Sequence, residues 1–171
     1  QKGPGAMHAP WLISLAAGLV VGGLSQFSRL CTVGGFRDLF LFKKSILIFG
    51  YLAVLVGVFL VNISFGNFHL GFENQPIAHT DGLWNFLGMA LAGFCSVLLG
   101  GCPLRQLIMT GEGNSDSAVT VLGLAAGAAF AHNFGLAASG AGPTLNGEIA
   151  VVVGFIVALI IAVVNTKRVN A

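Results

Sequence analysis

Charged residues are scarce in this 171-residue chain, where Lys, Arg, Asp and Glu together make up 8% of the sequence. Soluble domains carry about 25% of such residues, so a soluble globular fold is excluded. The net charge of +2 and the lack of a long basic run argue against nucleic acid as a partner. With 56% hydrophobic residues and a mean hydropathy of +0.89, the chain is predicted to be an all-α integral membrane protein surrounded by membrane lipid.

Motifs of common enzyme classes are also lacking. The sequence has no Walker loop, no Rossmann glycine fingerprint and no Ser/His/Asp order. Its three cysteines, Cys31, Cys95 and Cys102, lie in or beside apolar segments, which argues against an extracellular disulfide framework. They also lack the local spacing of zinc ligands. We therefore expect a protein that is not an enzyme and that needs no metal or other cofactor.

Apolar runs divide the chain into five predicted spans, each near or above the roughly 17 residues that a bilayer requires. These spans cover 11–27, 45–64, 83–99, 117–138 and 149–164. A polar, turn-like segment at 1–10 precedes a single membrane domain at 11–165, and a short cytoplasmic tail follows at 166–171. Because the sequence starts at Gln1 instead of Met, we expect a processed product or a piece of a longer chain.

Basic residues predict the orientation of the spans. Lys43 and Lys44 precede the second span, and Lys167 and Arg168 follow the fifth, so these ends should face the cytoplasm. The loop at 65–82 contains acidic residues but no Lys or Arg, so it should face outward. These assignments agree only if two short segments return to the side that they left, which also places the N-terminus outside.

An internal repeat accounts for those two short segments. Each unit contains a glycine-rich span, a cysteine, an arginine, a short apolar segment and a second span. The units cover about 11–64 and 83–138, and 149–164 forms an extra helix. Transporters often place their site where two such repeats bring broken helices together near the membrane midplane. The pattern predicts that Cys31 and Cys102 face one another across a path.

The residues of the second break predict clearly where one helix ends and the next begins. A long apolar run stops at Gly100-Gly101 and is followed by Cys102 and Pro103. Proline lacks an amide hydrogen, disfavours helical geometry in the residue before it, and suits the first position of a new helix. A helix should therefore end near Gly101, and a short segment at 104–109 should begin beside Cys102. Free N–H groups at such a start favour an anion or a thiolate.

The first break is similar, because Cys31 precedes Gly34-Gly35 and a short segment at 36–42. At both breaks we favour a functional cysteine over a small apolar filler. Cys95 is a weaker candidate, because it lies seven residues before Cys102 with no break of its own. The glycines of both breaks, together with Pro103, are candidate gate residues.

The charged residues near the breaks leave alternatives open. Arg37 and Arg105 are either interfacial anchors or groups that line the path, since arginine near the midplane usually pairs or lines a site. Glu112 either caps a helix, forms part of a flexible gate or pairs with Arg105. Ser115 or Asp116 is expected as the N-cap of the fourth span.

Two stretches resemble the YeeE/YedE sulfur-transport family: SRLCTVGGFRDLFLFK at 28–43 and GGCPLRQLIMTGEGNSDSAVTVLG at 100–123. The second is similar to the family's selenium-transporter branch. The resemblance implies an inner-membrane protein that takes up thiosulfate or a related sulfur- or selenium-containing anion. It also implies that Cys31 and Cys102, and more weakly Cys95, pass the anion along by transient thiol contacts. Short helices would point their N-termini toward it.

Members of that family are usually about double this length. The resemblance therefore implies either a C-terminal portion that pairs with a missing N-terminal half, or a half-size subunit that forms a homodimer. Two other functions stay open. One is a membrane thiol protein that accepts sulfane sulfur or selenium covalently and passes it to a cytoplasmic carrier protein. The other is a structural subunit of a larger transporter.

Overall fold

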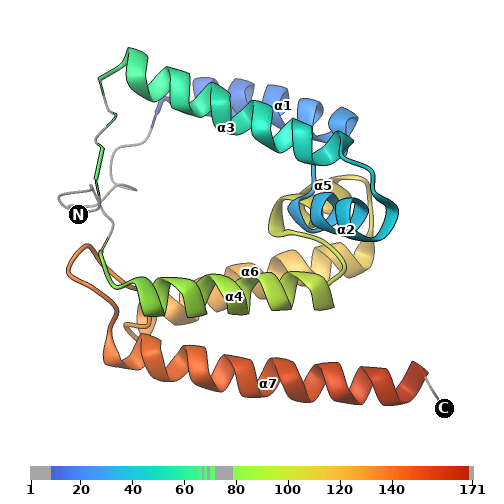
Figure 1. Ribbon diagram of the computed structural model, residues 1–171, viewed down its shortest axis with the longest axis vertical. Coiled ribbons are helices and arrows are strands. Elements are labelled where there is room, and N and C mark those ends of the chain that lie inside the picture. Colours follow the sequence, from blue (N-terminus) through green and yellow to red (C-terminus); the bar gives the residue numbers. More distant parts are fainter. Residues whose placement is uncertain (1–8, 67, 69, 72–78, 170–171) are drawn as a thin grey trace.

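A computed structural model describes residues 9–66, 68, 70–71 and 79–169, and in this part the chain is helical (Figure 1). Five long helices and two short ones confirm the predicted class of an all-α membrane protein with two broken segments. In chain order they are α1 (Trp11–Ser28), α2 (Thr32–Phe42), α3 (Ile46–Ser64), α4 (Gly82–Leu98), α5 (Pro103–Gly111), α6 (Ser115–Asn133) and α7 (Leu145–Val169).

Four segments of the described chain are long and apolar enough to cross a membrane. They are Trp11–Phe42, Ile46–Ser64, Gly82–Gly111 and Leu145–Thr166. The first and third of these segments each contain a long helix and the short helix that follows it. Helix α6 is not among them, because it is rich in alanine and glycine and has polar residues at both ends. The large apolar side chains of the long helices are mostly exposed, as expected where lipid is the solvent.

Helices α1 and α4 are each followed by a turn with the same hydrogen-bond pattern. After α1, the Leu30 N–H donates to the Ser25 carbonyl at 3.3 Å. After α4, the Gly101 N–H donates to the Ser96 carbonyl at 3.1 Å. Such a six-residue closure satisfies carbonyls that the helix end would otherwise leave unpaired. The two turns are related by a constant offset of 71 residues.

The same offset covers the residues that end one helix and start the next. Arg29 and Gly100 both adopt the left-handed conformation, with φ of 50° and 73°. Two residues later, Cys31 and Cys102 adopt extended backbone and serve as the N-caps of α2 and α5. The internal repeat is therefore present, and the geometry of the break sets its register. In this register Arg105 is equivalent to Gly34, so the arginines of the two units are not equivalent.

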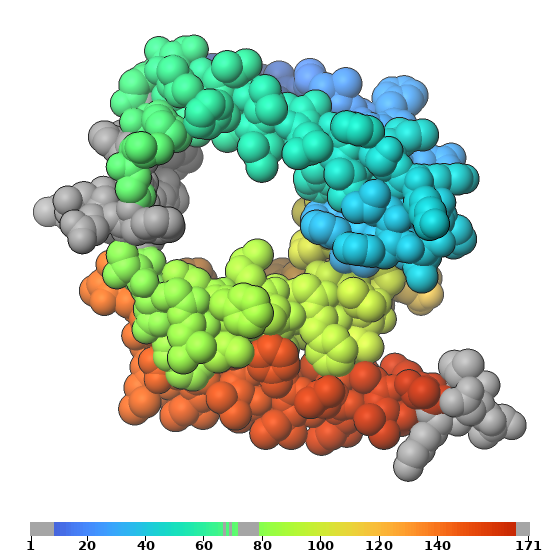
Figure 2. Space-filling view, in the orientation of Figure 1, coloured from blue at the N-terminus to red at the C-terminus, as the bar shows by residue number. Residues whose placement is uncertain are grey.

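The two units pack crosswise. Within each unit the short helix lies against the following long helix, α2 on α3 and α5 on α6. Between units, α1 contacts α5 and α2 contacts α4, so exchanging the units leaves the contact pattern unchanged. Helix α7 lies outside this symmetry and packs on α4. Figure 2 shows an opening between α3 and α4 that is bounded on one side by the short helices.

Helix boundaries differ from the predicted ones where polar side chains cap the ends. Helix α2 begins at Thr32 instead of 36, because the Cys31 sulfur accepts a hydrogen bond from the Gly34 N–H. The prediction that Ser115 or Asp116 is the N-cap of the fourth span is wrong. Asn114 takes that role, and its Oδ1 accepts a 2.9 Å hydrogen bond from the Ser117 N–H.

The last two helices also depart from the predicted spans. Helix α6 ends at Asn133 instead of 138, because the left-handed Gly135, with φ of 63°, redirects the chain. Helix α7 begins at Leu145, four residues before the predicted start. The Thr144 hydroxyl caps its first turn by accepting a 3.0 Å hydrogen bond from the Gly147 N–H.

Candidate functional site

The buried side chains of the described residues are few, and most of them are polar or thiol groups. Apart from glycine they are Ser25, Cys31, Cys102, Gln106, Ser117 and Ala158. All but Ala158 lie at a helix break or at the start of a helix of the second unit. In a chain that exposes its large apolar side chains, buried polar and thiol groups at the helix breaks are candidates for a functional centre.

Cys31 is 9% exposed and caps the first turn of α2. Its Sγ accepts a hydrogen bond from the Gly34 N–H at 3.4 Å. A Cβ atom at Gly34 would lie 3.4 Å from the Cys31 Cβ and 3.6 Å from its Sγ, so glycine permits this close approach. The sulfur is thereby fixed at the positive end of a short helix.

Cys102 is 6% exposed and lies next to Cys31. Its thiol has the side chains of Cys31 and Thr32 as polar neighbours, together with the backbone N–H groups of Thr32 and Arg105. Unlike Cys31, it makes no side-chain capping hydrogen bond. The first turns of α2 and α5 therefore both face this one thiol. The sequence analysis predicted that Cys31 and Cys102 face one another across a path, and the structure places the two thiols close together.

Tyr51 on α3 is a member of this cluster that the sequence analysis missed. The Thr32 hydroxyl donates a 2.6 Å hydrogen bond to the Tyr51 phenol oxygen. Tyr51 also interacts electrostatically with both Cys31 and Cys102. It is the only tyrosine in the sequence and lies within an otherwise apolar span, which is the signal that sequence reasoning had available. Thr32 and Tyr51 together line a hollow of about 430 Å³ between α2 and α3.

Gln106 was also missed. Its side chain is buried, and its Nε2 donates a 3.0 Å hydrogen bond to the Leu99 carbonyl. A Cβ atom at Gly101 would lie 3.4 Å from this Nε2, so the glycine leaves room for the amide. The bond ties α5 to the end of α4 and thereby holds the position of Cys102.

Arg105 is the better placed of the two predicted arginines. Its side chain is 23% exposed, and its Nη1 lies 3.7 Å from the Glu112 Oε1. This nitrogen is buried and has no hydrogen-bond partner among the described residues. The Arg105–Glu112 pair is one of the alternatives predicted for Glu112. It leaves part of the guanidinium's hydrogen-bonding capacity unused.

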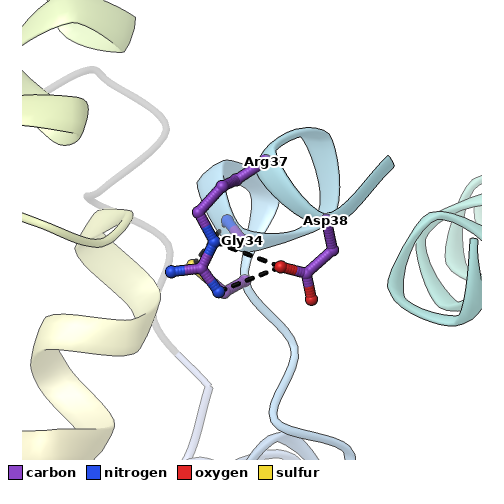
Figure 3. Close-up of polar contacts among 4 residues, drawn as sticks. Gly34, Arg37 and Asp38 are labelled. Carbon is purple, nitrogen blue, oxygen red and sulfur yellow. Dashed lines mark hydrogen bonds and ion pairs between the residues drawn. The ribbon is translucent and has the colours of Figure 1, made fainter. Parts of the chain in front are cut away.

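Arg37 has a different environment. Its side chain is 60% exposed, and its Nε and Nη2 donate to the Asp38 Oδ1 at 3.1 and 3.0 Å (Figure 3). An exposed pair of this kind holds the guanidinium on its own helix. Of the two arginines, only Arg105 contributes a group next to Cys102, and that group is its backbone N–H, while its guanidinium pairs with Glu112 at the other end of α5.

Cys95 is half-buried within α4. Helix α4 ends at Leu98, so Cys95 and Cys102 do not lie on one continuous helix. Among the described residues, no group of three or more His, Cys, Asp or Glu side chains could hold a metal ion.

Comparison with known protein families adds a second kind of observation to this geometry. Residues 27–169 match the family model described as sulphur transport. The chain belongs to the sulphur transport family. The match covers all three cysteines, both helix breaks and every helix from α2 to α7. No curated protein and no solved structure compared with the chain matches it.

Membership of the sulphur transport family and the four membrane-crossing segments agree. Together they identify an integral membrane protein of a sulfur-transporting family. Such a protein works in membrane lipid on a small anionic substrate. The group of buried side chains at the two breaks is the candidate place for that substrate.

Proposed function

We propose that this chain forms part of a thiol-lined path for uptake of a small sulfur-containing anion, thiosulfate or a selenium-containing analogue, across the inner membrane. One observation carries the proposal. Cys31 and Cys102 are buried side by side where the first turns of two short helices meet. No other cysteine of the chain lies in such a place, since Cys95 is half-buried in mid-helix.

The groups around the cysteines suit an anion that has lost its water. Backbone N–H groups at two helix starts carry partial positive charge, and Arg105 in the first turn of α5 adds a charge that Glu112 partly offsets. The hydroxyls of Thr32 and Tyr51 supply polar contacts. The polarizable sulfur of each thiol would contact the terminal sulfur or selenium of the substrate. Each contact must stay weak, because a tightly held anion would not leave.

A covalent alternative is favoured by the adjacency of the two thiols. In it, a Cys102 thiolate attacks the outer sulfur of thiosulfate. A new S–S bond forms, the S–S bond of thiosulfate breaks, and sulfite leaves with the bonding electron pair. The resulting persulfide on Cys102 would pass its outer sulfur to Cys31 and then to a cytoplasmic carrier protein. Mass spectrometry of the isolated protein after exposure to thiosulfate distinguishes the two mechanisms, since only the covalent one leaves a persulfide.

Uptake of labelled thiosulfate by cells that lack other routes tests the path. Cys31→Ala and Cys102→Ala are each expected to reduce uptake by roughly tenfold or more, since each removes a polar contact in a dehydrated site. Cys95→Ala is the matched control and should transport normally. Normal uptake by Cys102→Ala at equal membrane abundance would contradict the proposal. Parallel assays with selenite and a selenium analogue of thiosulfate define the substrate range.

A further inference from the structure

A second hollow, with polar side chains in part of its wall, lies at the opposite ends of the helices, away from both cysteines. It occupies about 260 Å³ between the start of α4, the start of α7 and the connection that joins α6 to α7. Its walls include His79, Trp84, Asn85, Met89, Pro143 and Glu148. No lysine or arginine lines it.

The polar atoms of this hollow can accept hydrogen bonds. The Glu148 carboxylate has no ion-pair partner among the described residues. The His79 Nδ1 is buried and has no hydrogen-bond partner among them. A carboxylate and an unpaired imidazole nitrogen disfavour an anion and suit a cation that carries N–H donors. The Trp84 ring adds a face of the kind on which ammonium groups bind.

An apolar groove of about 260 Å³ adjoins this hollow and shares Trp84 and Glu148 with it. Beyond these two residues the groove is lined by Ile149, Val152 and Val153, all of which are exposed on α7. The combined site therefore has an acceptor-rich end at the helix termini and an apolar strip that runs along α7. Tryptophan at helix termini is typical of the membrane interface.

Hydrogen bonds within the chain shape the polar end. The Asn85 Nδ2 donates to the His79 carbonyl at 3.2 Å. The Thr144 hydroxyl donates to the Gly135 carbonyl at 2.7 Å, and this contact fixes the connection between α6 and α7. The hollow is thus formed by the fold itself.

We propose that this hollow binds a membrane phospholipid with a primary ammonium headgroup. The headgroup lies against Glu148, His79 and Trp84, and one acyl chain lies along the α7 strip. A hydrated metal ion fits less well, because hard cations take six or more oxygen ligands and this wall is largely apolar and aromatic. The site is independent of the thiol cluster, so the proposal does not depend on the transported anion.

Trp84 provides a reporter for the test. The sequence has two tryptophans, so Trp11→Phe leaves Trp84 as the single emitter. The full protein carrying this substitution is reconstituted in nanodiscs of phosphatidylethanolamine or phosphatidylglycerol, and lipid that stays bound is counted by native mass spectrometry. We expect a shift of Trp84 emission and roughly tenfold greater retention with phosphatidylethanolamine, because the headgroup gains a charge-assisted contact. Glu148→Gln should remove both effects.

Asp116→Asn is the matched control, since it removes a carboxylate at the opposite membrane face. Equal retention of the two lipids, or unchanged selectivity in a folded Glu148→Gln protein, would overturn the proposal. If Glu148→Gln does not fold, Val153→Phe tests the same site from the exposed apolar strip. It should weaken retention of phosphatidylethanolamine while free ethanolamine still shifts Trp84 emission. If free ethanolamine binds as tightly as the lipid, the apolar strip on α7 does not contribute to lipid binding.

Discussion

The Thr32 hydroxyl donates a 2.6 Å hydrogen bond to the Tyr51 phenol, and this bond joins the start of α2 to the second turn of α3. Tyr51 also interacts with Cys31 and Cys102, so one side chain links both repeat units. A single polar network therefore connects the two thiols of the proposed path.

Tyr51→Phe keeps the ring and removes the hydroxyl. We expect thiosulfate uptake to fall roughly five- to tenfold, because a polar group in a dehydrated site contributes about 1–1.5 kcal/mol. Phe59→Leu, on the same helix but away from the thiols, is the control and should transport normally. Undiminished uptake by the Tyr51→Phe protein at equal abundance would show that the phenol is not part of the path.

The adjacency of Cys31 and Cys102 can be measured without transport. In a Cys95→Ser background, dibromobimane should join the two thiols and become fluorescent, because the reagent emits after both of its arms have reacted. Removing either Cys31 or Cys102 in that background should abolish the signal. No signal in this background, or a signal that appears only when Cys95 is restored, would contradict the arrangement described above.

Neutralising Glu112 should strengthen the attraction of Arg105 for an anion. Because the carboxylate lies 3.7 Å from the guanidinium, Glu112→Gln removes an opposing charge. The KM for thiosulfate should fall roughly two- to fivefold, the range of a partly exposed ion pair. Arg105→Gln should raise the KM, and Arg37→Gln should leave it unchanged. A rise in KM for Glu112→Gln would mean that the carboxylate itself positions the substrate.

Gly100 ends the turn after α4 with φ of 73° in otherwise open space. Gly100→Ala should therefore lower the free energy of unfolding by about 1–2 kcal/mol through backbone strain alone. Gly57→Ala, at an open helical position in α3, should raise it by up to about 1 kcal/mol. Thermal unfolding in detergent measures both. Equal effects of the two substitutions would refute the backbone argument.

Two glycines of α7 differ in what a methyl group would meet. At Gly147 an added Cβ would lie 2.5 Å from the Leu136 carbonyl oxygen, which belongs to backbone. At Gly154 it would lie 2.7 Å from the end of the Leu91 side chain, which can rotate away. We expect Gly147→Ala to lower the melting temperature more than Gly154→Ala. The reverse order would show that the α4–α7 contact is the more rigid of the two.

Several features of the fold were predictable because they depend on local chemistry. Pro103 at the first position of a helix and the glycines before Cys102 break the apolar run, and this break does not depend on the rest of the fold. The position of the first break was predictable too, but the start of α2 was misplaced. A cysteine thiol that accepts a capping hydrogen bond from the Gly34 N–H has no distinct sequence signature.

The sequence alone determined the membrane class, the number of helix breaks and the cysteines at those breaks, since hydropathy, proline and glycine act within a few residues of where they stand. Only the tertiary structure decided which polar groups meet. Cys102 meets Cys31 and Thr32 from the other repeat unit, and Tyr51 reaches the thiols from a third helix. These relationships depend on the crosswise packing of α1 on α5 and of α2 on α4, where contacts between distant segments are set by the shapes of whole helices.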